Sequence, residues 1–469
     1  MLSVTPWAPY RILTNTATAP STYDQLYPLV DLYFKHINPW SPILDRSTSV
    51  ETFFGVYPPA YPDGVLLLAI IAVTLRFSAD PYWTPQMCEQ MHALAREQVL
   101  IQCHETPSLK ALQAITILAW NFLGASEGPQ ISSLVAIAVR NVTRMGLHLE
   151  GGVSLAPSTT NPPGWLQDAM LPTCTSWLED EGRRRLFWVI YALERYEAVS
   201  LGSDCALPEE EINRRLPCRY DLFSQNQHVE TGYFSDKRPS SPIVTHPENL
   251  GSFSYHCEVL RVLGRTQIFF RRPLDICSQA EVDHWRQSYR DLDDELSSSL
   301  ANLPNEYSKV SQLCHSDPTS RISNWIMFHA AVITTVIRLH SCAAYPTARS
   351  LIFMPSLHAS QRCLAAVDSL WQIAQDVYQN GVLNLLGPHF GFAVWTAARV
   401  QLVHAANTSN EIDSRYKFFI FVLNQMSHVW PVTGQYAQRL ENVCERSEKA
   451  RSAPGGDKSA PKALCAMRK

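Results

Sequence analysis

Residues 176–217 read SWLEDEGRRRLFWVIYALERYEAVSLGSDCALPEEEINRRLP. Ser176 followed three residues later by Glu179 is the pattern of a capping box, which satisfies free backbone N–H groups where a helix begins. Apolar residues then recur near helical spacing, and aromatic residues widen the apolar face. Gly202 is suited to end the helix, because glycine adopts the left-handed conformation without steric cost. The stretch predicts a long helix, apolar on most sides, inside a helical domain.

Helical patterns also cover most of the remaining chain, and none of its segments shows the sustained alternation of a strand. The longest apolar run, Val65 to Leu75, is shorter than the ~20 residues needed to cross a bilayer, so it indicates a buried helix. We therefore predict an all-α protein. The predicted helices lie at 23–34, 64–77, 84–103, 108–123, 129–147, 255–270, 280–303, 324–343, 356–379, 391–406 and 414–429.

Composition at the two ends and in the middle suggests where the helical part begins and ends. Residues 1–21 are rich in Thr, Pro and Ala, and residues 446–469 are basic and contain Pro, Gly and Ser. We expect a disordered N-terminus at 1–21, one helical domain at 22–445 and a disordered basic tail at 446–469. A Pro- and Ser-rich stretch at 225–253 suggests a break that would divide the domain into two helical halves.

Composition also limits the classes of function. The net charge of −4 lacks the basic excess of an autonomous DNA-binding protein. Only 17% of residues are charged, against ~25% in an average soluble protein, and this predicts a large buried core. The twelve cysteines form no C-x-x-C pair and no secretory signal is evident, so we expect a reducing, intracellular compartment.

One motif has the form of a catalytic site. Residues 124–128, Gly-Ala-Ser-Glu-Gly, match the G-x-S-x-G elbow that exposes a nucleophilic serine, here Ser126, between a strand and a helix. Residues 112–123 have a helical pattern, which favours a turn between two helices. The sequence has no H-E-x-x-H, no P-loop and no G-x-G-x-x-G. We therefore predict no catalytic, cofactor-binding or metal-ligating residues.

Three consecutive arginines, Arg183 to Arg185, could bind an anion or form a short nuclear signal. The alternative is that they form structural ion pairs inside the domain, and we favour it, because a buried charge requires a partner. Glu194 and Glu197 lie on the same predicted helix but too far along it to meet these arginines. We therefore expect a carboxylate partner from another helix.

The same stretch resembles the middle homology region of fungal zinc-cluster transcription factors. Two further motifs occur in the order typical of that family, a Pro-x-x-Pro within 33–46 and a Gly-Leu-His that closes the helix at 129–147. The sequence departs from the family at Glu194, where Asp is usual, and after Gly202, where Gly-Arg-Pro is frequent. The residues that match the family motifs are Pro39, Pro42, Gly146, His148, Arg183, Arg184, Arg185, Trp188, Glu194, Arg195, Gly202 and Pro217.

The resemblance implies a large helical regulatory domain of the fungal transcription factor type, in a nuclear regulator of one biosynthetic or catabolic pathway, such as secondary metabolism. The zinc cluster of that family needs six closely spaced cysteines, whereas the first cysteine here is Cys88. We therefore expect indirect association with DNA, through a DNA-binding transcription factor or a second copy of this chain. A small-molecule effector is a further expectation, and no membrane contact is expected. The alternatives are a hydrolase-like helical enzyme of secondary metabolism that uses Ser126, and an interaction scaffold.

Overall fold

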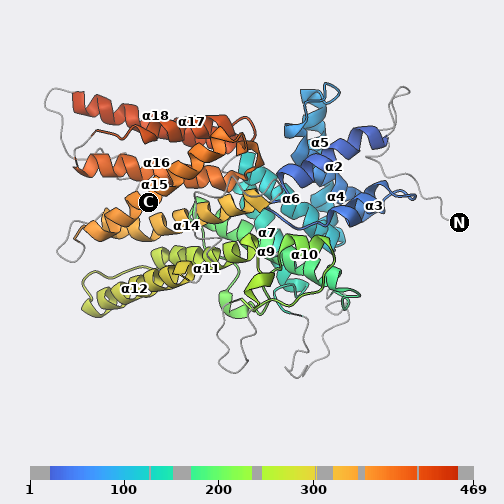
Figure 1. Ribbon diagram of the computed structural model, residues 1–469, viewed down its shortest axis with the longest axis horizontal. Coiled ribbons are helices and arrows are strands. Elements are labelled where there is room, and N and C mark those ends of the chain that lie inside the picture. The colour runs from blue at the N-terminus through green and yellow to red at the C-terminus, as the bar shows by residue number, and fades with distance from the viewer. Residues whose placement is uncertain are drawn as a thin grey trace, which may run out of the picture. The chain divides into compact units, whose positions relative to one another are not determined.

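The computed structural model describes residues 22–125, 128–150, 171–234, 246–301, 303, 321–346, 354–408 and 411–452. Over these residues the chain forms fifteen α-helices, several short 3₁₀ turns and three isolated β-bridges, with no named strand (Figure 1). The all-α prediction is confirmed. The expected disordered N-terminus at 1–21, Ser126 and the tail from residue 453 lie outside the described residues.

The helices agree with the predicted ones to within a few residues, with three additions, one of which is the short helix at 220–224. Residues 46–54 lack apolar periodicity, and their helix begins where the Asp45 side chain accepts a hydrogen bond from the Thr48 backbone N–H at 2.8 Å. The last helix begins at Pro431 and extends to Ser452, past the expected boundary at 445. The helices are α2 (Thr22–His36), α3 (Arg46–Phe54), α4 (Tyr61–Thr74), α5 (Pro85–Glu105), α6 (Leu109–Ala125), α7 (Pro129–Arg144), α9 (Trp177–Leu201), α10 (Tyr220–Ser224), α11 (Ser252–Arg271), α12 (Gln279–Ala301), α14 (Arg321–Ala344), α15 (Leu357–Gln379), α16 (Pro388–Thr408), α17 (Arg415–Met426) and α18 (Pro431–Ser452).

The chain divides into two compact units, and α9 contributes to both. The first unit comprises Met1–Phe122, Gly128–Leu193 and Ala206–Gly251. The second comprises Leu123–Glu127, Glu194–Cys205 and Ser252–Lys469. The last transition, at Gly251, falls inside the stretch 225–253 in which the sequence suggests a break.

In the first unit, α4 is the central helix and packs against α2, α3 and α5. All its residues from Gly64 to Thr74 are buried, as the uninterrupted apolar run predicts. The segment after α2 contains Pro39 and Pro42, which are both buried and end the helix because proline cannot donate a backbone hydrogen bond. Asn38 replaces the missing helical bonds by pairing with both the N–H and the carbonyl of Leu44.

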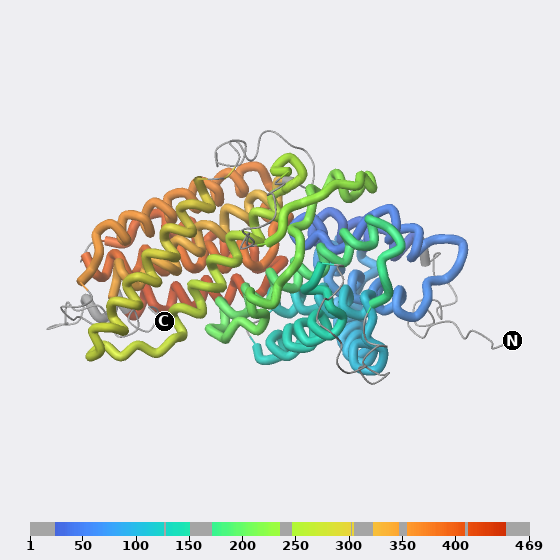
Figure 2. The backbone as a smooth tube through the Cα atoms, turned by 90° about the horizontal axis from the view of Figure 1, so that it is seen from below, coloured from blue at the N-terminus to red at the C-terminus, as the bar shows by residue number. Residues whose placement is uncertain are grey.

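The second unit is a helical bundle made of α11, α12 and α14 to α18, which run alongside one another in Figures 1 and 2. Helix α14 lies among α11, α15 and α16 and makes most of its contacts with them. By length and composition α14 is apolar enough to cross a membrane, but most of this apolar stretch is buried inside the bundle. Its Thr334 and Thr335 hydroxyl groups donate to carbonyls one turn earlier, so they need no solvent.

Glycines end two of the helices in the manner that the sequence predicts. Gly202 has a φ of +71°, and the N–H of Ser203 donates to the carbonyl of Ala198 at 2.9 Å, which closes α9. Gly146 has a φ of +69° and closes α7 in the same way, because the Leu147 N–H donates to the Val142 carbonyl at 3.0 Å.

Gly124, in the last turn of α6, packs against an aromatic ring. A Cβ atom added there would lie 2.1 Å from the Trp430 ring, which is buried and fixed by a 2.8 Å hydrogen bond from its Nε1 to the Leu386 carbonyl. The first glycine of the G-x-S-x-G motif therefore has a packing role.

Replacing Gly124 with Ala should lower the free energy of unfolding by about 1–3 kcal/mol, because the methyl group has no room beside the indole. Gly182, in the interior of α9, provides the matched control, since a Cβ atom there meets nothing within 4 Å. Gly182→Ala should raise stability by about 0.5–1 kcal/mol through helix propensity. Urea denaturation of both variants measures the difference, and equal effects would contradict the packing role.

Candidate functional site

The three arginines at the start of α9 form ion pairs with carboxylates on the preceding turn of the same helix. Arg183 contacts Glu179, Arg184 contacts Asp180 at 2.7 Å and also Glu181, and Arg185 contacts Glu181 at 3.0 Å. The expectation of structural ion pairs is confirmed. The expectation that the partner must come from another helix is wrong, because carboxylates three and four residues before an arginine lie on the same helix face.

Glu181 is the most buried member of the arginine network, which consists of the ion pairs of Arg183, Arg184 and Arg185, and its side chain is 0% exposed. One carboxylate oxygen forms an ion pair with Arg185, 3.0 Å from its Nε, and accepts a hydrogen bond from the Cys218 backbone N–H at 2.9 Å. The other oxygen accepts from Arg184. Arg185 in turn donates to the Cys218 carbonyl. A buried carboxylate is tolerated only with such complete compensation, so Glu181 fixes the position of residue 218 against α9.

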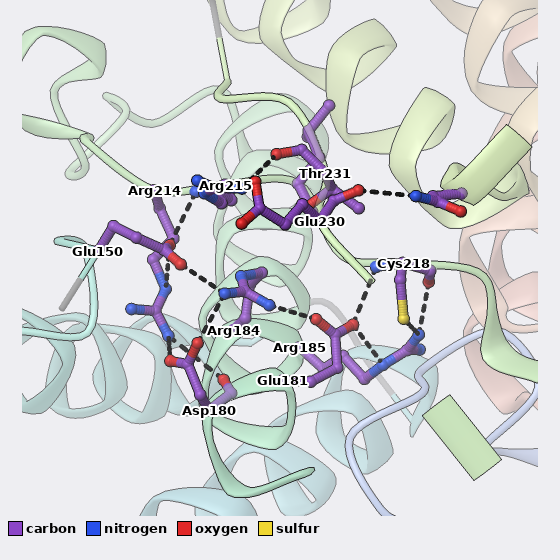
Figure 3. A network of polar contacts seen from close by, with 12 residues as sticks. Glu150, Asp180, Glu181, Arg184, Arg185, Arg214, Arg215, Cys218, Glu230 and Thr231 are labelled. Carbon is purple, nitrogen blue, oxygen red and sulfur yellow. Dashed lines mark hydrogen bonds and ion pairs between the residues drawn. The ribbon is translucent and has the colours of Figure 1, made fainter. Parts of the chain in front are cut away.

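Glu150 extends the network to two segments outside α9. Its carboxylate pairs with Arg184 and accepts from the Arg215 backbone N–H at 3.0 Å (Figure 3). Arg214 lies beside it, pairing with Asp180 at 3.3 Å and donating to the Leu149 carbonyl at 2.6 Å. Burial would raise the pKa of the Glu150 carboxyl, but Arg184 and Arg214 together hold the pKa below its ordinary value.

Aromatic contacts join the network to the other motif residues of the first unit. Trp188 donates from Nε1 to the Arg215 carbonyl at 2.7 Å, and its ring lies 4.7 Å from that of Phe234. The Arg185 guanidinium lies over the rings of Phe223, at 4.4 Å, and Tyr220, at 5.5 Å.

The remaining motif residues of the first unit lie around this network. The Tyr220 hydroxyl accepts from Asn38 at 3.0 Å and thereby reaches the segment of Pro39 and Pro42. The carbonyl of His148 accepts from the Asn213 N–H at 3.0 Å. Pro217 is buried and directly precedes Cys218 in the sequence. Burial lowers the pKa of the His148 imidazole. The structure thus brings together Pro39, Pro42, Gly146, His148, Arg183, Arg184, Arg185, Trp188 and Pro217 within one unit.

The other three motif residues belong to the second unit. Glu194 and Arg195 form an ion pair in which each side chain is 1% exposed. Arg195 packs against Gly264 of α11, where a Cβ atom would lie 2.5 Å from the arginine Nε. Gly202, at the end of α9, lies in the wall of a cavity of about 740 Å³.

We expect a small-molecule effector from the sequence, but the sequence does not show where in the fold a cavity for it lies. The walls of the cavity beside Gly202 come mainly from α11, α14 and α16, and they include Gln267, Arg338 and Arg399. The signal in the sequence was a single arginine within each of two otherwise apolar helices, at 338 and 399. Periodicity places such residues on a helix but does not show that two of them face one cavity.

Two features of the part of the chain that the structure describes bear on the possibility of catalysis. No cluster of three or more His, Cys, Asp or Glu side chains suited to a metal occurs there. Tyr196, His256 and His389 form a buried cluster, with 2.8 Å between the Tyr196 hydroxyl and His256 Nε2. Burial lowers the pKa of His256 to about 3, so this imidazole stays neutral near pH 7 and acts as a core residue.

The structure around Ser126 differs from the one that a nucleophilic serine of a hydrolase requires. Ser126 itself lies outside the described residues, but the chain before it is helical from Leu109 to Ala125. A nucleophile elbow requires a strand at that place. The motif therefore does not form the strand–turn–helix arrangement of a hydrolase.

Comparison with known proteins identifies the family to which this helical chain belongs. Residues 30–337, more than half of the chain, match the model of the fungal specific transcription factor domain. The chain belongs to this family. The matched range contains the whole arginine network and all the motif residues.

Curated relatives are transcriptional regulators of fungi. The chain is 19% identical over 405 residues to the Zn(2)-C6 fungal-type transcription factor FTF1c of Fusarium oxysporum f. sp. lycopersici. This alignment covers 83% of this chain and 42% of the relative. It is 23% identical over 282 residues to a positive regulator of purine utilization of Emericella nidulans, covering 50% of this chain and 25% of the relative. It is 24% identical over 226 residues to the notoamide biosynthesis cluster transcriptional coactivator notQ' of Aspergillus versicolor. This alignment covers 48% of this chain and 39% of the relative.

The chain spans less than half the length of each of these relatives. No solved structure matches it.

Replacing Glu181 with Gln should lower the free energy of unfolding by about 3–5 kcal/mol, because Arg185 keeps its buried charge without a carboxylate partner. The control is Glu179→Gln, which removes a carboxylate that is 33% exposed and should cost about 1 kcal/mol or less. Thermal or urea unfolding compares the two variants. A loss for Glu181→Gln no larger than that for the control would show that the buried pair carries little stability.

The lowered pKa of Glu150 predicts a dependence of stability on pH. A carboxyl group whose pKa is lower in the folded chain stabilises it at pH values above the ordinary carboxyl pKa, and this contribution disappears as the pH falls through the folded pKa. The stability difference between the wild type and Glu150→Gln should therefore be largest near pH 6 and shrink toward pH 3. Urea unfolding across this range measures it, and a constant difference would contradict the charge interaction.

Proposed function

We propose that this chain is the regulatory domain of a fungal transcriptional regulator that controls one metabolic pathway. The family match over residues 30–337 carries the proposal, because it covers the network that organises the first unit and most of α14 in the second. Two of the relatives are named for a single pathway, purine utilization in one and notoamide biosynthesis in the other. We extend control of a pathway from them to this chain.

The proposed role is exerted in the nucleus, and contact with DNA is indirect. The 469 residues carry no group of six closely spaced cysteines, and their net charge is −4. Both features argue against direct binding to the polyanionic duplex by these residues. A DNA-binding transcription factor, or a second copy of this chain within a larger assembly, would supply the contact. The relative that is named a transcriptional coactivator supports a role of this kind.

Depletion of the protein in its host, followed by transcript and metabolite profiling, tests the proposal. A coordinated change in one set of genes is expected, and expression of the wild type should restore it. Ser126→Ala should restore it equally, because the serine has no catalytic role in this proposal. Unchanged transcripts together with one accumulating metabolite would overturn it and favour the enzyme alternative.

The indirect contact with DNA has its own test. The purified chain should not retard promoter DNA from the affected genes in an electrophoretic mobility assay, whereas chromatin immunoprecipitation of the protein from cells should recover the same promoters. Retardation of the DNA by the purified chain alone, in a sequence-dependent manner, would contradict indirect association.

A further inference from the structure

The cavity in the second unit has the size of a ligand site. It measures about 740 Å³, within the range of roughly 300–1,000 Å³ typical of small-molecule pockets. Its wall combines apolar side chains with a few polar ones, which is also typical of such pockets. The residues that carry the argument are Gln267, Phe270, Arg338, Arg399, Val400 and Val403.

Arg399 is the first of two wall arginines without a carboxylate partner among the described residues. Its Nε is buried and has no hydrogen-bond acceptor there, and its guanidinium lies over the ring of Trp395 at 4.4 Å. Burial and the nearby charge of Arg338 lower the pKa of Arg399 to about 10, so the group remains charged at neutral pH.

Arg338 is the second wall arginine without a carboxylate partner among the described residues. Its described hydrogen bond joins it to the neutral amide oxygen of Gln267 at 2.8 Å. Burial lowers its pKa as well. A third wall arginine, Arg271, differs because it already forms an ion pair with Asp204. Among the wall residues that the structure describes, Arg338 and Arg399 are therefore two mutually repelling cations, and no wall residue is acidic.

The arginine network of the first unit shows how this chain compensates buried guanidinium groups elsewhere. There, Arg183, Arg184 and Arg185 all contact carboxylates. A charged group away from water is costly without a partner of opposite charge. The two cavity arginines are partly buried and have no carboxylate partner among the described residues, and a ligand can supply the anion.

The neutral polar groups of the wall are largely occupied within the protein. The Thr396 hydroxyl donates to the Phe392 carbonyl at 2.8 Å, and the Tyr345 hydroxyl is 3.0 Å from His404 Nδ1. The guanidinium groups are thus the polar groups most available to a ligand, and the rest of the wall is apolar at Phe270, Val400 and Val403.

We propose that this cavity binds an amphipathic organic carboxylate, with its carboxylate between Arg338 and Arg399 and its apolar body along Phe270, Val400 and Val403. Binding depends only on the cavity. The consequence that such an acid acts as the effector of the regulator rests on the function proposed above.

Binding is tested on the full chain with decanoate as the probe and 1-decanol as its uncharged match, using isothermal titration calorimetry and the shift of the melting temperature. Decanoate should bind at least roughly tenfold more tightly than the alcohol, as expected for hydrogen bonds to a charged group. Arg338→Gln and Arg399→Gln should each abolish most of this preference. Arg286→Gln removes a half-exposed arginine from α12 and serves as the control, which should keep the preference for decanoate.

Each result decides for or against the site. Equal affinity for the acid and the alcohol, no binding of either, or a preference that survives in both cavity variants would overturn the proposal. Melting curves show whether the variants fold, and Arg399→Lys, which keeps the charge, provides a second comparison in which part of the preference should remain.

A transcript readout separates this inference from the proposed function. Wild-type and Arg399→Gln chains are compared for the gene set affected by depletion, with and without added decanoate. Tight binding in vitro together with transcripts that never respond to depletion would leave the site standing and overturn the regulator. A change in transcripts on depletion, together with no binding of the acid, would leave the regulator standing and overturn the site.

Discussion

The structure of the first unit depends on one buried carboxylate. Glu181 has no exposure to solvent. Its carboxylate forms ion pairs with two guanidinium groups and accepts a hydrogen bond from one backbone N–H. Because a buried charge is stable only when all its partners are in place, this side chain ties the start of α9 to the segment around Cys218. Glu150, in the segment that follows α7, forms an ion pair with Arg214 and thereby adds this segment to the network. The family's Arg-Arg-Arg motif is therefore a structural device in this chain, and its arginines already have partners.

The sequence predicted the parts of this structure that depend on local pattern. The apolar run of α4, the Gly202 end of α9 and the Gly146 end of α7 all follow from periodicity or from the conformational freedom of glycine. Helix α3 was missed because its residues lack an apolar face and its start depends on the Asp45 cap. The carboxylate partners of the arginines lie four residues earlier on the same helix, so helix geometry alone was sufficient to predict them. The place and the lining of the cavity could not be predicted, since they depend on how α11, α14 and α16 pack.

The chain handles buried cations in two different ways. In the first unit, carboxylates on α9 and nearby segments balance every arginine of the triple motif. In the second unit, Glu194 balances Arg195 next to Gly264, whereas Arg338 and Arg399 face a cavity and have no acidic neighbour among the described residues. The same physical requirement thus yields a closed network in one unit and an open site in the other. The contrast separates the residues that build the fold from those available to a ligand.

The division of α9 between the two units limits how this protein can be cut into pieces. The chain passes between the units five times: within α6, between Glu127 and Gly128, within α9, after Cys205 and after Gly251. A fragment that stops at residue 251 would retain residues 194–201 without the bundle against which they pack, and a fragment that starts at 252 would lack them. Deletion series, the usual means of mapping regulatory regions, would therefore produce misfolded fragments at most end points. Loss of function in such a series would report unfolding, and point substitutions are the suitable tool for assigning roles to either unit.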